Sequence, residues 1–326
     1  MKILVTGGTG FTGRHLCKRL ISNGLPVRAL VRDLKRSNEL QKWGVELVLG
    51  DLRDRYSLGK ATVGVELIYN VAAIYRMNNA TRRELWETNV QGTKNLIDAA
   101  IDAGVKRFVH CSTVGVHGHI VSPPGDENSP FAPGDSYQQS KAEGESIVNQ
   151  YMEERRIPAV VFRPCGIYGP GDLRFLKLFK AIKSGMFLII GSGEVYYHTI
   201  YIDDLIEGIL LCGTKKEAIG NVYILGDENY VTLNRFIEFI ADVLDVNFPR
   251  FHIPFNPVYY AGILCEFICK PLGINPPLYR RRVDFFRKNR AFDISKAKLE
   301  LGFQPKVDLR SGLLKTARWY QREGLL

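Results

Sequence analysis

A glycine-rich turn near the start of the chain constrains the fold more than any other feature. Residues 2–5 have the pattern of a buried strand, and TGGTGFTG at 6–13 follows it directly and opens a helical pattern. Glycines at 8, 10 and 13 have the G-x-G-x-x-G spacing of a strand-to-helix turn that holds a dinucleotide. Without Cβ atoms, the backbone can approach a pyrophosphate, which lies at the positive end of the helix. The sequence therefore predicts dinucleotide binding.

Strand and helix patterns alternate through the first two thirds of the chain. Strands are predicted at 2–6, 26–31, 45–49, 66–71, 106–111 and 159–163, and helices at 11–23, 33–43, 81–103 and 137–155, with a short helix near Tyr56. Repeated βα units predict an α/β fold, a Rossmann doubly wound parallel sheet with helices on both faces. Ligands of such sheets bind at the carboxyl ends of the strands.

After Gly171 the alternation loosens. Helices are predicted at 173–184, 203–212, 233–244 and 257–269, and strands at 196–202 and 221–225. We assign residues 1–170 to the dinucleotide-binding domain, with 196–226 returning to it. Residues 171–195 and 227–326 form a smaller, interwoven C-terminal substrate domain. We expect the apolar helix at 257–269 to pack over a substrate pocket as a lid, and the alternative is that it lies on a membrane.

Composition disfavours several classes of protein. No apolar run reaches the ~20 residues of a membrane helix, and the start lacks a signal peptide, so we expect a cytoplasmic protein without an integral membrane segment. The six cysteines form no C-x-x-C pair and the six histidines have no ligand spacing. We therefore expect neither a disulfide framework nor a metal site. The sequence also lacks the G-x-S-x-G motif of many serine hydrolases.

The positive charge is concentrated near the end of the chain. The net charge is +10, and residues 277–326 carry thirteen Lys or Arg against five Asp or Glu. A basic surface of this kind fits an anionic substrate, nucleic acid or an anionic membrane, or is a solvated face. We expect a small-molecule substrate and no nucleic-acid partner.

Tyr137 and Lys141 form a Y-x-x-x-K motif at the start of a predicted helix. Residues four apart lie on one helical face, so the ammonium can lower the pKa of the phenol and make it a general acid or base. Ser112 and Thr113 follow the predicted strand at 106–111 and place hydroxyls above the crevice. Such a hydroxyl can donate to a substrate carbonyl.

These motifs resemble, in order and spacing, the extended short-chain dehydrogenase/reductases. The resemblance covers essentially the whole chain and includes the glycine turn, Asp51-Leu52, NVAA at 70–73, NVQGT at 89–93, Ser112-Thr113, Tyr137 with Lys141, RP at 163–164, YGP at 168–170, DISKA at 293–297 and LGFQP at 301–305. It implies an enzyme that transfers a hydride with a nicotinamide cofactor. It also implies a homodimer paired through the helices at 81–103 and 137–155.

The resemblance also assigns residue roles. Tyr137 would be the acid/base, Lys141 would hold the nicotinamide ribose, and Thr113 would supply the catalytic hydroxyl, with Ser112 as the second choice. Asp51 and Leu52 would flank the adenine. The implied cofactor-binding set is Gly7, Gly10, Phe11, Thr12, Gly13, Arg32, Asp51, Leu52, Ala72, Ala73, Asn89, Ser112, Tyr137, Lys141 and Pro164.

Two departures from the family pattern narrow the subtype. Where NAD-preferring relatives carry an acid after the second strand, this chain has Arg32, which can pair with a 2′-phosphate and favours NADP(H). Asp33 is the alternative that keeps NAD(H) possible. Many nucleotide-sugar enzymes carry an asparagine before the IYGP segment, where this chain has Cys165-Gly166. That pattern resembles the branch of 3β-hydroxysteroid dehydrogenases, sterol dehydrogenases and dihydroflavonol reductases.

Three functions remain open from the sequence. The favoured one is an NAD(P)-dependent oxidoreductase that interconverts a secondary alcohol and a ketone on a fairly apolar small molecule. The second is a nucleotide-sugar epimerase or dehydratase with tightly bound NAD. The third is a non-catalytic module that senses a dinucleotide or binds RNA, which would not need Tyr137, Lys141 and Thr113.

Overall fold

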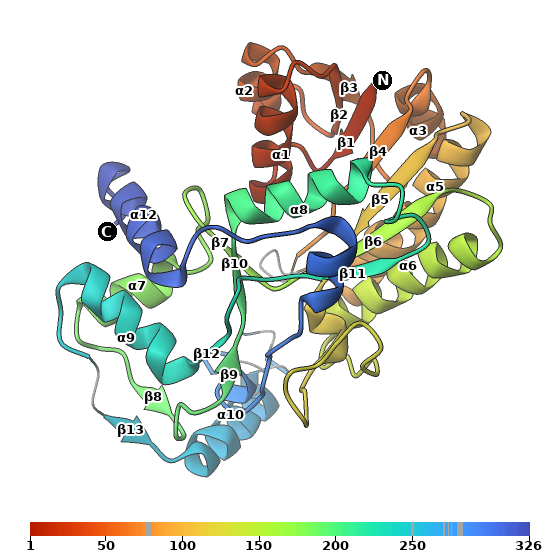
Figure 1. Cartoon of the computed structure of the whole chain (residues 1–326). Coiled ribbons are helices and arrows are strands. Elements are labelled where there is room, and N and C mark those ends of the chain that lie inside the picture. Colours follow the sequence, from red (N-terminus) through yellow and green to blue (C-terminus); the bar gives the residue numbers. More distant parts are fainter. Residues whose placement is uncertain (76–79, 249–250, 270, 273, 275, 279–282) are drawn as a thin grey trace.

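A seven-stranded parallel sheet forms the centre of the computed structural model, which describes residues 1–75, 80–248, 251–269, 271–272, 274, 276–278 and 283–326. The strand order is β11-β6-β5-β4-β1-β2-β3 (Figure 1). These strands are β1 (Ile3–Thr6), β2 (Val27–Val31), β3 (Glu46–Leu49), β4 (Leu67–Asn70), β5 (Arg107–Cys111), β6 (Ala159–Pro164) and β11 (Val222–Leu225). The order confirms the predicted Rossmann-type doubly wound sheet.

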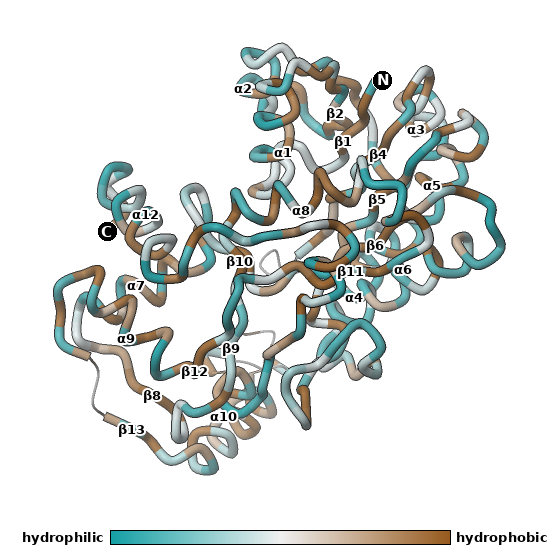
Figure 2. The backbone as a smooth tube through the Cα atoms, in the orientation of Figure 1, coloured by the Kyte–Doolittle hydropathy of each residue, from teal (hydrophilic) through white to brown (hydrophobic). Residues whose placement is uncertain are grey.

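Helices cover both faces of this sheet. One layer contains α1 (Phe11–Ser22), α2 (Asn38–Lys42) and α8 (Ile202–Thr214), and the other contains α3 (Arg55–Thr62), α5 (Gly92–Asp102) and α6 (Ser136–Glu153). Each layer buries its own hydrophobic core against the strands. The hydrophobic residues of β1 and of the facing part of α8 appear brown in Figure 2. Strands buried on both faces explain the nearly continuous apolar runs in the sequence.

A second region lies beside the carboxyl ends of the strands and contains three two-stranded sheets. They pair β7 (Gly166–Tyr168) with β10 (Thr199–Tyr201), β9 (Tyr196–Tyr197) with β12 (Val231–Thr232), and β8 (Ile189–Ile190) with β13 (His252–Ile253). Its helices are α7 (Leu176–Lys183), α9 (Leu233–Leu244), α10 (Phe255–Cys269) and α12 (Leu309–Arg322). The Tyr320 hydroxyl on α12 donates to the carbonyl of Asp172 at 2.6 Å.

Several predicted elements differ in their details. The helix expected at 33–43 is a 3₁₀ turn at Lys35–Ser37 followed by α2, because Asp33 caps a turn there by accepting from the amide of Lys35 at 2.9 Å. The helix expected at 81–103 contains α4 (Arg82–Trp86), a π-helical segment (Glu87–Gln91) and α5. The strand expected at 196–202 is divided into β9 and β10.

Other elements were not predicted. Strands β7, β8, β12 and β13 contain only two or three residues each, which is too short for a periodic signal. A 3₁₀ turn at Val114–His117 and a π-helical segment at Ala297–Leu301 were also missed. Helix α10 begins two residues before the predicted start and buries only Gly262 and Glu266.

Candidate active site

The glycine turn between β1 and α1 leaves no room for side chains. Gly7 has a φ of +70°, and a Cβ atom there would lie 2.8 Å from the Cα of Ala72. A Cβ on Gly13 would collide with the carbonyl oxygen of Gly7. The left-handed residue is therefore Gly7, one position before the glycine at 8 from which the sequence motif was counted. The turn requires glycine for sterics as well as for flexibility.

The amino end of α1 is open to an anion. Gly10 is its N-cap and provides no capping side chain, and the first turn contains no acidic residue. By contrast, Asp135 at α6 and Asp308 at α12 each accept a hydrogen bond from a backbone amide of the first turn. Uncapped amides at a helix start bind phosphate groups well. The exposed Gly10 and the half-buried Phe11 and Thr12 thus fit the pyrophosphate of a dinucleotide.

A buried polar chain ties together the strands at the point where the strand order reverses. The Thr6 hydroxyl donates to Asn70 Oδ1 at 2.8 Å and accepts from the amide of Ala72 at 3.1 Å. Asn70 Nδ2 lies 3.1 Å from His110 Nδ1. Burial lowers the pKa of His110 well below its usual value, so the imidazole is neutral and accepts from Asn70. These contacts fix the ends of β1, β4 and β5 around the crevice expected of this topology.

Helix α6 brings Lys141 to the end of β5. Its ammonium is buried, with 3% of the residue exposed, and donates to the carbonyl of Cys111 at 2.5 Å. Burial lowers the pKa of Lys141, and the nearby charge of Glu145 opposes that shift. Tyr137 lies one turn earlier on the same face and is half-buried. The structure therefore brings the Y-x-x-x-K pair beside the predicted Ser112-Thr113 hydroxyls.

A row of side chains connects Tyr137 with the glycine turn. The rings of Tyr137 and Tyr75 meet edge to face, with centroids 5.0 Å apart. The guanidinium of Arg174 lies 6.0 Å from the ring centroid of Tyr75 and 5.6 Å from that of Phe11. Because Phe11 is the first residue of α1, this row of side chains leads from Tyr137 to the amino end of that helix.

The two neighbouring hydroxyls have different surroundings. Thr113 is half-buried, and its Oγ1 accepts from the amide of Gly115 at 3.1 Å, which leaves its proton available to a ligand. Ser112 is buried and donates to Glu145. The Ser112 side chain is thus already engaged behind the strand, whereas the half-buried Thr113 uses only its hydroxyl oxygen, in the turn after β5.

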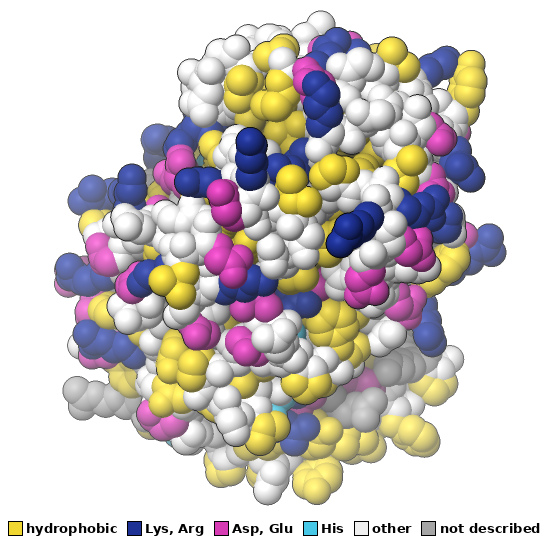
Figure 3. Space-filling view, turned by 45° about the vertical axis from the view of Figure 1, so that its right-hand side comes forward, with side chains coloured by type: hydrophobic (Ala, Val, Ile, Leu, Met, Phe, Trp, Pro, Cys, Tyr) yellow, Lys and Arg dark blue, Asp and Glu magenta, His cyan; other side chains and the backbone are white. Residues whose placement is uncertain are grey.

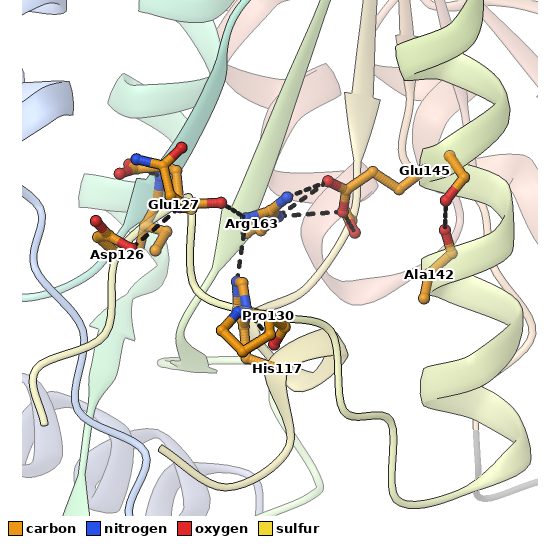
Figure 4. A network of polar contacts seen from close by, with 11 residues as sticks. His117, Asp126, Glu127, Pro130, Ala142, Glu145 and Arg163 are labelled. Atoms are coloured by element: carbon orange, nitrogen blue, oxygen red, sulfur yellow. Dashed lines mark hydrogen bonds and ion pairs between the residues drawn. The ribbon is translucent and has the colours of Figure 1, made fainter. Parts of the chain in front are cut away.

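Ser112 joins a buried ionic network by donating to Glu145, and Figure 4 shows Glu145, Arg163 and His117 of this network from close by. Glu145 accepts from Arg163 Nε at 3.0 Å and from Arg163 Nη2 at 2.5 Å. Arg163 also donates to the carbonyl of Glu127 at 2.7 Å and contacts His117 Nε2 at 3.0 Å. Burial and the charge of Arg163 lower the pKa of His117, so its neutral ring accepts. The network joins α6, β6 and the loop after β5.

Sequence reasoning did not assign Glu145 to the site, although a signal was present. Tyr137, Lys141 and Glu145 recur every four residues and therefore share one face of α6. Arg174 and Tyr75 left no comparable signal, because their proximity to Tyr137 arises from segments distant in sequence.

Asn89 braces the loop that follows β4. It is buried, and its side chain accepts from the amide of Ile74 at 2.9 Å and donates to the carbonyl of the same residue at 3.1 Å. Its amide nitrogen also donates to the Ser140 hydroxyl at 3.0 Å. Ala72 and the exposed Ala73 lie on this braced loop. The predicted residue Asn89 thus connects the loop to α6.

The other predicted cofactor residues lie at the edges of the crevice. Arg32 is exposed after β2. Hydrogen bonds from Arg53 lower the pKa of Asp51, and the charge of Arg32 makes a smaller contribution in the same direction. Leu52 is buried against Gly92 on α5. Pro164 is buried at the end of β6, where it pairs with Leu225.

An aromatic wall continues from this site into the second region. Tyr197 packs against Phe175, Phe236 and Phe285 with ring centroids 6.4, 5.2 and 5.3 Å away. Burial raises the pKa of Tyr197 to about 12, and the charge of Arg174 is close enough to oppose this shift. A Cβ atom on Gly166 would lie 2.8 Å from the Tyr197 hydroxyl. Tyr197 therefore occupies the space that a side chain at position 166 would need.

Two further features concern the chain as a whole. All six cysteines are free thiols. Among the helices formed by the described residues, none combines the length and hydropathy needed to span a bilayer.

Comparison with known proteins identifies the group to which this geometry belongs. The sequence model of the NAD-dependent epimerase/dehydratase family matches residues 3–226. The chain is 31% identical to 3beta-hydroxysteroid-dehydrogenase/decarboxylase isoform 1 of Arabidopsis thaliana, over 96% of this chain and 78% of that protein. It is 30% identical to the 4-hydroxy-2-methyl-3-oxo-4-farnesyl-3,4-dihydroquinoline-1-oxide ketoreductase of Stigmatella aurantiaca, over 96% and 95%.

A similar solved structure contains a nicotinamide cofactor. The dTDP-glucose 4,6-dehydratase of Streptomyces venezuelae with NAD bound has a TM-score of 0.78 and 26% identity, over the full length of both chains.

Proposed function

The chain belongs to the NAD-dependent epimerase/dehydratase family and is an NAD(P)-dependent enzyme of the extended short-chain dehydrogenase/reductase type, and we propose that it interconverts a secondary alcohol and a ketone on a fairly apolar small molecule. The observation that carries this proposal is the row from Tyr137 through Tyr75 to Arg174, whose neighbour Phe175 packs against Tyr197 of the aromatic wall. An apolar wall with few polar groups suits an apolar ligand. The steroid and farnesyl-quinoline names of two relatives point the same way.

The proposed roles follow from where each side chain lies. The nicotinamide supplies or accepts the hydride when it is bound. Tyr137 donates its Oη proton to the substrate oxygen during reduction and takes it back during oxidation. Thr113, whose hydroxyl oxygen already accepts from Gly115, donates its proton to the same substrate oxygen and orients it. Lys141, one helical turn away, favours the phenolate by its charge and binds the nicotinamide ribose.

The first test replaces Tyr137 with phenylalanine. Tyr137→Phe keeps the ring packed against Tyr75 and removes only the proton donor. We expect turnover of a ketone substrate to fall by a factor of ~10²–10⁴, while the Kd of the cofactor stays within a few-fold of wild type. Tyr56→Phe, on a residue that is 75% exposed on α3, is the control and should change neither quantity. Near wild-type turnover of Tyr137→Phe would remove the proposed acid/base.

We also propose that NADP(H) is preferred. Arg32 is exposed beside the carboxyl ends of β2 and β3, where it can pair with a 2′-phosphate. The competing Asp33 is held in its own turn, because it accepts from the Lys35 amide and lies 3.5 Å from Arg36 Nε. Arg32→Ala should raise KM for NADPH by about tenfold, since a hydrogen bond to a charged group contributes ~1.5–3 kcal/mol. KM for NADH should change less than threefold, and equal increases for both cofactors would refute the preference.

The nucleotide-sugar alternative is tested by the cofactor that copurifies. The Streptomyces venezuelae dehydratase makes this alternative worth measuring. NAD that stays bound through turnover and is not consumed would support it, whereas NADPH consumed in proportion to a ketone supports the oxidoreductase. Salt-sensitive RNA binding without turnover would support the non-catalytic module.

The remaining proposals concern organisation. Residues 1–170 with 196–226 hold the cofactor, and 171–195 with 227–326 shape the substrate side. A homodimer pairs through α4 to α6, where a surface groove is lined by Trp86, Ser136 and Glu143. Light scattering of the purified protein measures the molar mass and so tests the dimer.

A cytoplasmic location is supported by the six free thiols, since reducing compartments keep cysteines unpaired.

A further inference from the structure

Helix α10 carries its apolar residues on the outside. Its 15 residues include one charged side chain, Glu266, and that residue is buried together with Gly262. The exposed positions are Pro257, Tyr260, Ala261, Leu264, Phe267 and Ile268, apart from Asn256 in the first turn. Their spacing of three and four residues places them on one face of the helix. This face is apolar along its length, and we call it the α10 face.

Helix α9, in the same region, shows the usual arrangement. It buries Phe236, Ile237 and Ile240, and the side chains of Arg235 and Glu238 are 51% and 44% exposed and form an ion pair. On the α10 face, by contrast, Phe267 is 76% exposed, Tyr260 66% and Leu264 59%. A helix that turns its apolar side outward lacks a cover in the isolated chain.

Neighbouring segments extend the same apolar surface. Phe251, just before β13, is 77% exposed, and Leu272 and Ile274, just after α10, are 66% and 56% exposed. Figure 3 shows hydrophobic side chains gathered along the lower edge of the molecule, where α10 lies in Figure 1. An exposed patch of this kind marks an interaction site.

The sequence around this surface carries an excess of positive charge. Residues 251–290 contain seven Lys or Arg against two acidic residues, one of which is the buried Glu266. The guanidinium of Arg287 lies 5.1 Å from the ring centroid of Phe255 and 4.8 Å from that of Tyr259, at the amino end of α10. Arg287 is thus held against the helix by its aromatic residues and by an ion pair with Asp284, whose Oδ1 lies 2.7 Å from its Nε, and the Arg287 side chain remains 48% exposed.

We propose that the α10 face docks flat on an anionic membrane surface. Aromatic and aliphatic side chains on one helical face, with cations beside them, fit the boundary between acyl chains and anionic head groups. A second copy of this chain fits less well, because a two-fold interface through α10 would bring together the excess of cations that each copy carries in residues 251–290. The inference depends on this surface and not on the reaction that the crevice catalyses.

The test measures binding of the purified full-length protein to vesicles. Flotation with vesicles of phosphatidylcholine plus phosphatidylglycerol should carry the wild-type protein, and pure phosphatidylcholine should carry at least fivefold less. Leu264→Gln/Phe267→Gln removes two apolar side chains and should weaken binding by a factor of ~10–100, since burying each one is favourable. Arg287→Gln should weaken binding only to the anionic vesicles.

The matched control is Val121→Gln/Leu299→Gln, which changes two residues that are 83% and 85% exposed elsewhere on the surface. It should bind vesicles like the wild type, and thermal unfolding should show all variants folded. Absence of wild-type binding to anionic vesicles would overturn the proposal. Equal loss of vesicle binding in the control pair would also overturn it. So would a wild-type protein that binds no vesicles but forms a dimer, if Leu264→Gln/Phe267→Gln dissociates that dimer.

Discussion

The seven-stranded sheet and the region around β7 to β10 bury polar groups in different ways. Behind β5, Arg163 and Glu145 neutralise each other, and both carboxylate oxygens of Glu145 accept hydrogen bonds. In the second region the buried carboxylate of Asp227 accepts only from neutral donors, the Thr199 hydroxyl at 2.6 Å and the Tyr201 amide at 3.0 Å. Paired ions fix the geometry of a site, whereas neutral donors and aromatic rings tolerate change. The sheet around Ser112 is therefore held by ionic contacts, whereas the region around Asp227 is held by neutral hydrogen bonds and ring packing.

Breaking the ion pair behind the crevice should have the largest effect on stability. Glu145→Gln keeps the shape of the side chain but leaves Arg163 buried with an uncompensated charge. We expect the free energy of unfolding, measured with urea, to fall by ~3–5 kcal/mol.

The exposed pair of Arg235 and Glu238 on α9 provides the control. Both side chains are about half exposed, and Glu238→Gln should change the free energy of unfolding by no more than ~1 kcal/mol. A loss for Glu145→Gln as small as this would show that the two regions do not differ in the way we describe.

The buried Asp227 should make stability depend on pH. Burial raises the pKa of Asp227 to about 7, so the folded protein binds a proton that the unfolded chain releases near pH 4. A raised folded-state pKa means that stability falls as pH rises from about 4 to about 7. The free energy of unfolding of Asp227→Asn, relative to that of the wild type, should therefore rise by a few kcal/mol from about pH 4 to about pH 7, since one pKa unit is ~1.4 kcal/mol.

Asp308 should give stability the opposite dependence on pH. Hydrogen bonds from Ser311 lower the pKa of Asp308, so its contribution to stability is lost as pH falls. Thermal unfolding of Asp227→Asn and Asp308→Asn across pH 3–8 should give difference curves of opposite slope. Parallel curves would mean that the Asp227 carboxyl is not held protonated by its surroundings.

The smallest effect on stability is expected in the aromatic wall. Phe285→Leu removes a ring contact with Tyr197 and should lower the free energy of unfolding by ~0.5–1.5 kcal/mol. KM for bulky apolar ketones should change several-fold, with kcat nearly unchanged, because Phe285 packs on Tyr197, Phe286 and Arg290, none of which is a proposed proton-transfer group. Phe251→Leu, on a 77% exposed residue, should leave KM and stability unchanged. Identical kinetics for both variants would place the substrate away from this wall.

Much of the cofactor side was predictable from the sequence because its signals are local. The glycine turn, the Y-x-x-x-K spacing and the βα alternation each lie within a few residues, and the structure confirms the sheet they predict. The partners of Ser112 were not predictable, because Glu145 and Arg163 reach it from separate elements. Similarly, the two-residue strands of the second region form through long-range pairing and have no pattern of their own.

The sequence by itself determined where the apolar strands lie along the chain, where the turn needs glycine and which residues can transfer a proton. These features depend on local hydrophobic pattern, backbone sterics and helical spacing. Only the tertiary structure decided that Thr113 accepts from the Gly115 amide while Ser112 is turned toward Glu145, and that α10 buries its one carboxylate and exposes its apolar face. Hydrophobic periodicity indicates that a face exists but not what it packs against. That choice depends on contacts between segments far apart in the chain.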